Sequence, residues 1–402
     1  MGKLTKKKFM RELRRIGRQF RNIRTSTQQM AYDHFLATRH YDRKVAPTSM
    51  IREGSRPFSE RVAIVVLYPV NGVLPSHIRM LDYLASKGFA SVVLSNAEIA
   101  EEGVSQICEK CWRFISRPNV GYDFGAYRDG VRFVRDSLPK IEQLVFINDS
   151  TWFPMADTAD WLEQVAALDV DFAAAASNYG VPRPNAEDFQ EQSWGFSVKH
   201  RNFHYCSFAL SIRPVILRDR GFMKFWDSYK LSDDKQRTVR RGEIGLSQWV
   251  IRRGYSHDST LPVFDLDNRL RALPEDRLRA VAQNMVIPAH EVLVKIKQEI
   301  AFDPGTDRET LVRFILTTVA LQGSSYALSD FSVRDLGYPF LKKSPLWLDE
   351  DASEISMRIL KDHGGALTDA LVSEASALRN DRADWLNKDP DEQSDTLVAD
   401  AV

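Results

Sequence analysis

Short apolar segments that alternate with longer amphipathic ones constrain the fold of this chain most strongly. Residues 61–68 form an apolar run rich in β-branched residues, which is typical of a strand buried on both faces of a sheet. A helix is predicted over 75–87, closed by Gly88, and a second strand over 89–94. This order predicts βαβ units and a mainly parallel sheet.

The alternation continues along the chain and sets the expected fold class. Further strands are predicted over 112–115, 144–147, 170–176 and 206–212, and helices over 124–138, 214–229 and 243–253. Residues 270–345 are expected to be largely helical. We therefore expect an α/β core followed by a helical C-terminal region. Ligands of open parallel sheets bind at the carboxyl ends of the strands, so functional residues are expected there.

The first 24 residues form a separate and strongly basic segment, in which Glu12 is the one acid. Its apolar residues recur in steps of four and three, which predicts one apolar stripe on a helix: Phe9, Leu13, Ile16, Phe20 and Ile23. Such a helix could lie on an anionic membrane surface. A helix packed on the body of the protein and a solvated basic tail are the alternatives.

Composition excludes several classes of partner and compartment. The net charge of +1 creates no global field that would attract nucleic acid, so no nucleic-acid partner is expected. Three cysteines are too few for a disulfide framework and suit a reducing compartment. No apolar run has the length of a membrane span, and no secretory signal is recognised. We expect a cytoplasmic protein, with residues 1–24 as its candidate contact with the inner face of the plasma membrane.

A polar, glycine-containing turn after the third predicted strand is the first candidate site. Asn119 and Gly121 suit a turn because both tolerate unusual backbone angles. Asp123, Arg128 and Asp129 place charge beside it, and an arginine here could pair with a phosphate oxygen. An ordinary turn with a surface ion pair is the alternative.

Asn148 and Asp149 at the end of the fourth predicted strand are the second candidate site. A carboxylate beside Ser150 and Thr151 could offer oxygen ligands to Mg²⁺ or Mn²⁺. The cation would bridge the two phosphates of a sugar nucleotide and neutralise the leaving diphosphate. Alternatively, Asp149 caps the following turn. A single carboxylate is a sparse metal site, which keeps the metal an open question.

Glu243, at the predicted start of a helix, is the third candidate. Leu246 and Val250 on the same helix are expected to face inward. The carboxylate could deprotonate an acceptor hydroxyl. A first-turn glutamate that simply complements the helix dipole is the alternative.

The order of these three segments resembles that of GT-A glycosyltransferases. More narrowly, the chain resembles the rhamnan synthesis protein F family over about 61–345, in the segments 119–130, 148–150, 246–248 and 337–342, and residues 252–255 are similar to a motif of inverting enzymes. Two departures stand out. The metal motif is Asn-Asp-Ser rather than Asp-x-Asp, and the paired acids of the base motif are Glu243-Ile244.

The resemblance implies a domain organisation and an activity. It implies a GT-A-like nucleotide-sugar-binding core (59–270) and a helical part (271–345), whereas the basic amphipathic N-terminal segment (1–58) and the acidic polar tail (346–402) lie outside it and follow from composition. The implied reaction moves rhamnose or another deoxyhexose, with inversion, from a nucleotide-diphosphate donor. The acceptor would be a glycan or lipid-linked glycan of a growing cell-surface polysaccharide or lipopolysaccharide.

The same resemblance assigns roles to the candidate residues. Glu243 would be the catalytic base, and Asp149 would contact the Mg²⁺ or Mn²⁺ ion. The nucleotide-sugar site would comprise Asn119, Gly121, Asp123, Arg128, Asp129, Asn148 and Asp149. Two other classes remain open: a catalytically silent glycan- or nucleotide-binding module, and a scaffold of a polysaccharide-assembly complex.

Overall fold

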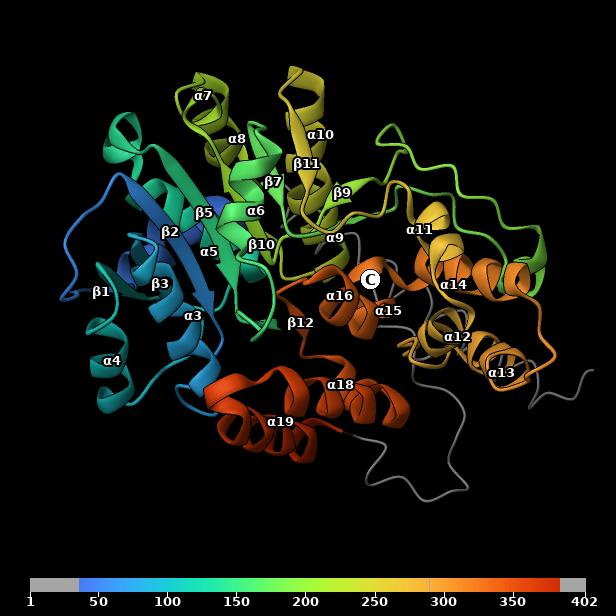
Figure 1. Cartoon of the computed structure of the whole chain (residues 1–402). Helices are drawn as coiled ribbons and strands as arrows, with labels where there is room; N and C mark the ends of the chain where they lie inside the picture. The colour runs from blue at the N-terminus through green and yellow to red at the C-terminus, as the bar shows by residue number, and fades with distance from the viewer. Residues whose placement is uncertain (1–35, 289, 384–402) are drawn as a thin grey trace, which may run out of the picture.

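The computed structural model describes residues 36–288 and 290–383, and one eight-stranded sheet organises it (Figure 1). Across the sheet the strands are β1 (Met50–Glu53), β4 (Arg113–Ser116), β3 (Ala90–Ser95), β2 (Arg61–Leu67), β5 (Gln143–Asn148), β10 (Ala209–Ile212), β7 (Phe172–Ala174) and β11 (His257–Ser259). The block from β4 to β5 is parallel, as is the pair β7–β11, whereas β1 and β10 run antiparallel to their neighbours.

Helices cover both faces of this sheet. Even-numbered residues of β2 pack toward α5 (Tyr122–Phe133) and α8 (Arg220–Ser228), and odd-numbered ones toward α3 (Pro75–Ser86) and α6 (Trp161–Leu168). This two-sided burial explains the uninterrupted apolar sequence of the strand. Further helical segments of the core are α4 (Glu101–Cys108), η3 (Arg135–Lys140), η4 (Ala186–Glu191), α7 (Pro214–Leu217), α9 (Lys235–Val239), η5 (Arg240–Ile244) and α10 (Gly245–Arg253).

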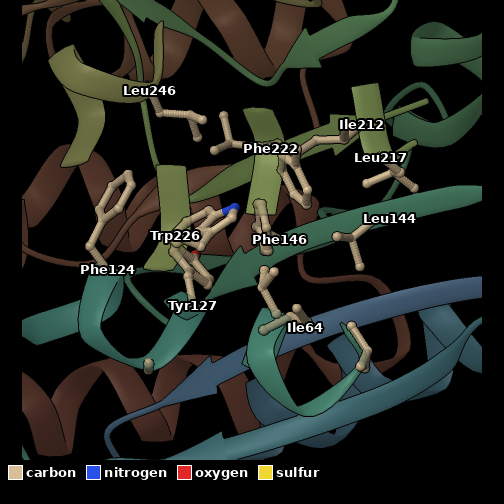
Figure 2. Close-up of a cluster of buried hydrophobic side chains, with 14 of the residues drawn as sticks. Ile64, Phe124, Tyr127, Leu144, Phe146, Ile212, Leu217, Phe222, Trp226 and Leu246 are labelled. Carbon is tan, nitrogen blue, oxygen red and sulfur yellow. The ribbon is translucent and has the colours of Figure 1, made fainter. Parts of the chain in front are cut away.

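Aromatic packing joins α5 and α8 to the sheet, as Figure 2 shows around Trp226. The Trp226 ring stacks on Phe124 of α5 with centroids 6.0 Å apart and meets Phe146 of β5 edge-on at 5.5 Å. All three side chains are buried. Aromatic pairs of this kind add about 0.5–1.5 kcal/mol to the free energy of area burial. The packing fixes α5, whose first turn carries one of the candidate site residues.

The helical C-terminal region has a hydrophobic core of its own around α14 (Arg308–Gln322). The other helices of this region are α11 (Leu266–Ala272), α12 (Glu275–Gln283), α13 (Glu291–Ile300), α15 (Ser324–Ala327) and α16 (Ser329–Leu336). The predicted fold class, an α/β core with a mainly parallel sheet followed by a helical C-terminal region, is therefore confirmed.

The segment that composition describes as an acidic polar tail folds as far as Arg382. It contains α17 (Pro345–Leu348), α18 (Glu350–His363), η6 (Gly365–Leu367) and α19 (Thr368–Arg382). The two long helices lie beside α3 and the strand β12 (Leu341–Lys342), where they bury apolar side chains such as Ile359 and Leu371 (Figure 1). Many of the acidic residues of α18 and α19 lie on exposed faces, and the apolar residues lie on the buried faces. The average composition of the segment therefore does not reveal that these helices are amphipathic.

The described part of the N-terminal segment begins with α2 (Ala37–His40), η1 (Tyr41–Val45) and η2 (Ala46–Thr48), followed by β1 on the edge of the sheet. The basic segment 1–24 lies outside the described residues. Across 36–288 and 290–383, no helix is both long and apolar enough to span a bilayer.

Candidate functional site

The strand order places the candidate site at the point where the sheet changes direction. From β2 the chain passes to β3 and β4 on one side, then returns to β5 on the other side of β2. Ligands of open α/β sheets bind outside the carboxyl ends of the two strands at such a point. Here Tyr68 follows β2 and Asp149 follows β5, and the Tyr68 N–H donates to Asp149 Oδ2 over 2.7 Å.

Basic groups hold the Asp149 carboxylate in its ionised form. His77 Nε2 lies 3.3 Å from Asp149 Oδ2. His77 Nδ1 accepts the Leu74 N–H at 3.1 Å, so the proton of a neutral ring sits on Nε2, facing the carboxylate. Burial by itself would raise the pKa of Asp149. The contacts with His77, the charge of Lys343 and the Tyr68 amide outweigh burial and hold that pKa below its ordinary value.

Asn148 braces a second carboxylate. Its Nδ2 donates to Asp123 Oδ2 over 2.7 Å. Its Oδ1 accepts the Ser150 N–H at 3.1 Å and the Ser150 hydroxyl at 2.6 Å. Both the nitrogen and the oxygen of the Asn148 amide are therefore hydrogen-bonded, and they connect the end of β5 to the first turn of α5. The structure brings the two predicted segments together through this residue.

Asp123 titrates far above an ordinary aspartate. Burial is the main cause, and the negative charges of Asp149 and Glu243 add to it, against the weaker opposing charges of Lys342 and Arg117. The pKa of Asp123 is raised to about 7. Perturbed carboxyl groups at the carboxyl edge of a sheet are a frequent property of functional sites.

Glu243 acts electrostatically on Asp123 and so faces the same region. It lies in the π-helical turn η5 rather than at the start of an α-helix, and such turns often occur at functional sites. Its Oε1 accepts the Ser207 hydroxyl over 2.5 Å, and its Oε2 lies 3.3 Å from His204 Nε2. Gly242 allows the close approach, because a Cβ there would lie 2.4 Å from the Phe124 ring. The carboxylate is oriented at both oxygens, as a positioned base requires.

Two lysines complete the site, and sequence reasoning missed them. The strand β12 pairs with β6 (Thr151–Trp152), directly after Asp149, and so brings Lys342 to the site. Its Nζ lies 3.4 Å from Ser150 Oγ and 4.0 Å from the centroid of the Phe208 ring. The available signal was a pair of consecutive lysines after an apolar turn: Lys342 ends the noted segment 337–342, and Lys343 follows it.

Lys343 is buried behind its neighbour. Its Nζ lies 2.8 Å from the Ser76 hydroxyl and 3.0 Å from Glu374 Oε1. Glu374 belongs to α19 and also accepts the Trp152 indole N–H at 3.0 Å. The last described helix therefore holds a cation that acts on Asp149.

Arg128 and Asp129, two of the predicted nucleotide-sugar-binding residues, form their contacts with the N-terminal segment and with Arg117. Arg128 is buried, and its guanidinium donates to both Asp42 carboxylate oxygens at 2.8 Å. Asp129 accepts from Arg117 at 2.9 Å and from the Tyr41 hydroxyl. These bonds attach the N-terminal segment to α5, so both residues have structural partners.

Asn119 and Gly121 form the expected turn. Asn119 is exposed, and Gly121 has a φ of 78°, in the left-handed region where glycine is favoured. The Gly121 N–H donates to Asp233 Oδ1 at 2.8 Å. The turn packs on the loop that contains Leu231 and Asp233, which explains its glycine.

The donor set fits a divalent cation poorly. Nowhere in 36–288 and 290–383 do three or more His, Cys, Asp or Glu side chains gather as metal ligands do. Asp149 Oδ2 already accepts the Tyr68 N–H, and the groups that lower the pKa of Asp149 are His77, Lys343 and this amide. The Asp149 carboxylate therefore already has protein partners, and the described residues place no set of three ligands around it for an ion.

The sequence profile of rhamnan synthesis protein F matches residues 91–324, more than half of the chain. The chain belongs to the rhamnan synthesis protein F family. The matched region contains Asp123, Asn148, Asp149 and Glu243, whereas Lys342 and Lys343 follow it. A relative of this family member, the uncharacterized protein y4gN of Sinorhizobium fredii, is 27% identical over 302 residues, which cover 74% of this chain and 70% of that protein.

Two solved structures have partial similarity to this family member. Core-mannan synthase A from Aspergillus fumigatus, in an Mn/GDP form, superposes with a TM-score of 0.28 at 10% identity, over 49% of this chain and 70% of that one. TarS of S. aureus superposes with a TM-score of 0.25 at 12% identity, over 80% of this chain and 54% of that one.

Proposed function

We propose that this protein is a glycosyltransferase with a GT-A-like core, which uses a nucleotide-diphosphate sugar in polysaccharide synthesis. One observation carries the proposal: at the point where the sheet changes direction, two carboxyl groups lie within electrostatic range of a third. The pKa of Asp149 is lowered, whereas the negative charges of Asp149 and Glu243 contribute to the raised pKa of Asp123. Membership of the rhamnan synthesis protein F family supports it.

The donor binds at the carboxyl ends of β2 and β5. The Lys342 ammonium suits a donor phosphate and stabilises the charge that develops on the leaving diphosphate. An ionised carboxylate only accepts hydrogen bonds, so Asp149 suits a hydroxyl of the donor. Asp123 lies next to Asp149 and is braced by Asn148 to present its carboxyl to the same ligand. Arg128 and Asp129 are not part of this donor site, because their contacts are structural.

Glu243 takes the proton of the acceptor hydroxyl as that oxygen attacks the anomeric carbon of the donor sugar. The bond from this carbon to the diphosphate breaks in the same step, so the anomeric configuration inverts. Ser207 and His204 hold the carboxylate in one orientation, which lowers the cost of positioning it. The transferred sugar is rhamnose or another deoxyhexose, on the basis of the family description.

The acceptor is a glycan or lipid-linked glycan of a cell-surface polysaccharide or lipopolysaccharide. The reaction takes place on the cytoplasmic side of the plasma membrane, with the basic residues 1–24 in contact with its anionic surface. The charge of that segment and the use of a nucleotide-sugar donor support this location.

Calorimetric titration tests the donor site. dTDP-rhamnose, GDP-rhamnose, GDP-mannose and UDP-glucose are titrated into the full chain, Asp149→Ala and the control Asp136→Ala, an exposed aspartate on η3. One donor is expected to bind the wild type and Asp136→Ala, and to bind Asp149→Ala at least ten-fold more weakly. Binding without any transfer or hydrolysis would instead indicate a silent binding module, and no binding by the folded chain would indicate a scaffold.

A further inference from the structure

Lys342 is held at the candidate site by neutral groups rather than by a carboxylate. Its Nζ lies 4.0 Å from the centroid of the Phe208 ring and 5.7 Å from that of the Tyr326 ring. Its third neighbour is Ser150 Oγ, at 3.4 Å. Among the residues that the structure describes, Lys342 forms no ion pair, whereas the adjacent Lys343 is paired with a carboxylate. The charge of this half-buried ammonium is therefore available to an anionic ligand.

The Phe208 ring is a fixed surface for the ammonium. The side chain is 2% exposed, and its ring centroid lies 5.5 Å from that of Phe340, which stacks on Phe153 at 4.2 Å. The backbone is also fixed, since the Phe208 carbonyl accepts the Asn148 N–H at 3.1 Å. A cation within about 6 Å of a ring face is attracted by the ring quadrupole, more strongly where water is excluded.

The hydroxyl of Ser150 connects the lysine to the carboxyl groups of the site. It donates to Asn148 Oδ1 over 2.6 Å, so its oxygen can accept from the Lys342 ammonium. Asn148 in turn donates to Asp123 over 2.7 Å. The charge of Lys342 also opposes the increase in the pKa of Asp123. Lys342 therefore belongs to the same site as the carboxyl groups, on contacts that do not neutralise it.

The turn before β10 contacts both the candidate base and the lysine. The Ser207 hydroxyl donates to Glu243 Oε1 over 2.5 Å, and the next residue, Phe208, carries the Lys342 ammonium on its ring. One short turn thus fixes the position of the acceptor base relative to that of the cation proposed to bind the donor phosphates.

We propose that Phe208 is a positioning residue, whose ring holds the Lys342 ammonium where the diphosphate of the donor binds. Phe208 acts through the lysine and contacts no reacting atom. A lysine side chain loses conformational freedom when it binds a phosphate, and a ring that already holds the ammonium reduces this loss. The inference rests on the proposed function. It implies that the ring contributes to donor affinity only while Lys342 is present.

A double-mutant cycle on the full chain tests this role. Calorimetry measures the Kd of the four nucleotide sugars named above, and of UDP, GDP and dTDP, for Phe208→Leu, Lys342→Met and the two combined. The control is Phe114→Leu, which removes a ring of the same 2% exposure from β4. If Phe208→Leu does not fold, Phe208→Met, which retains more of the side-chain volume, takes its place in the cycle.

The ring substitution should weaken donor binding by about five-fold or more in the wild type. The same substitution should change Kd by less than about two-fold when Lys342 is already methionine. Equal losses in the two backgrounds would indicate a merely structural role and overturn the inference, as would unchanged binding in Phe208→Leu or an equal loss in Phe114→Leu. These outcomes leave the proposed donor site intact. No binding of any probe by the folded wild type overturns the donor site, and this inference with it.

Discussion

The His204 ring is held between two hydrogen-bond acceptors, with Nδ1 2.8 Å from the Asn202 carbonyl oxygen and Nε2 3.3 Å from Glu243 Oε2. A neutral imidazole has one N–H and cannot donate to both. The ring therefore donates to one of these two oxygens, and the two contacts together fix the orientation of the imidazole beside the Glu243 carboxylate.

The first prediction concerns this pair. His204→Gln should lower kcat by about ten-fold or more, and Glu243→Gln by about 10²–10⁴-fold, because the first loosens the base and the second removes it. Donor Kd should change little in either variant, since Glu243 acts on the acceptor. Steady-state kinetics with calorimetry measures both, and His200→Gln in the neighbouring loop is the control. A loss of donor binding equal to the loss of kcat would contradict this assignment.

The second prediction follows from the raised pKa of Asp123. The folded state holds this proton up to about pH 7, whereas the unfolded chain loses it near its ordinary value of 3.8. Between these values the unfolded state binds fewer protons, so this group lowers the free energy of unfolding as pH rises. Asp123→Asn should therefore be more stable than the wild type at pH 8, by about 1–3 kcal/mol, and the gain should shrink toward pH 4.

Urea denaturation at several pH values measures this difference, with Asp136→Asn as the exposed control. The amide that replaces the Asp123 carboxyl group keeps an oxygen that can still accept from Asn148, so the brace is retained. Activity should fall in the same variant. A gain that does not vary with pH would show that Asp123 titrates as an ordinary aspartate.

The third prediction separates the two lysines. Lys342→Met should weaken donor binding by about ten-fold or more with little loss of stability, because its ammonium is proposed to meet the phosphates. Lys343→Met should mainly destabilise the fold, by about 3–5 kcal/mol, since it leaves the buried Glu374 without its cation. Calorimetry measures the donor affinity of both variants, and thermal unfolding measures their stability. Equal effects of the two substitutions on affinity would argue against Lys342 as the phosphate contact.

The fourth prediction concerns metal. Because His77, Lys343 and the Tyr68 amide already stabilise Asp149 and the described residues supply no cluster of ligands, transfer should persist after treatment with EDTA. Added Mn²⁺ should raise kcat less than about three-fold, well below the several kcal/mol a Lewis acid supplies to a transition state. An activity that disappears with EDTA and returns with Mn²⁺ would assign the ion to Asp149 and the donor phosphates.

The fifth prediction tests Arg128. Asp42→Ala leaves a buried guanidinium without its bidentate partner and should cost about 3–5 kcal/mol of stability. Donor Kd, measured below the lowered melting temperature, should be unchanged. Asp227→Ala is the control, since it removes the partner of the exposed Arg135. A loss of donor affinity in Asp42→Ala without a matching loss in the control would show that Arg128 belongs to the nucleotide-sugar site.

The strands and their carboxyl ends could be predicted because their signals are local. An apolar run followed by Asn148-Asp149 shows both a buried strand and a polar residue at its end, and the placement of Asn148 beside Asp123 follows from parallel order. The direction of β10 could not be predicted, since an apolar run looks the same whether its strand is parallel or antiparallel.

Most features of the site that could not be predicted depend on contacts between residues that are distant in sequence. Arg128 next to a strand end suggested a phosphate contact, but its partner Asp42 lies 86 positions away. Lys342 reaches the site only because β12 pairs with β6, and neither two-residue strand has a recognisable pattern.

The ion pair between Lys343 and Glu374 has a consequence for how the protein matures. A ribosome synthesises the sheet long before it synthesises α19, so a nascent chain can hold a complete set of strands while Lys343 still lacks its carboxylate. Asp149 then sits in an electrostatic environment different from that of the finished protein. Competence to bind a donor would thus arise late in translation, once Glu374 has been synthesised and has paired with Lys343.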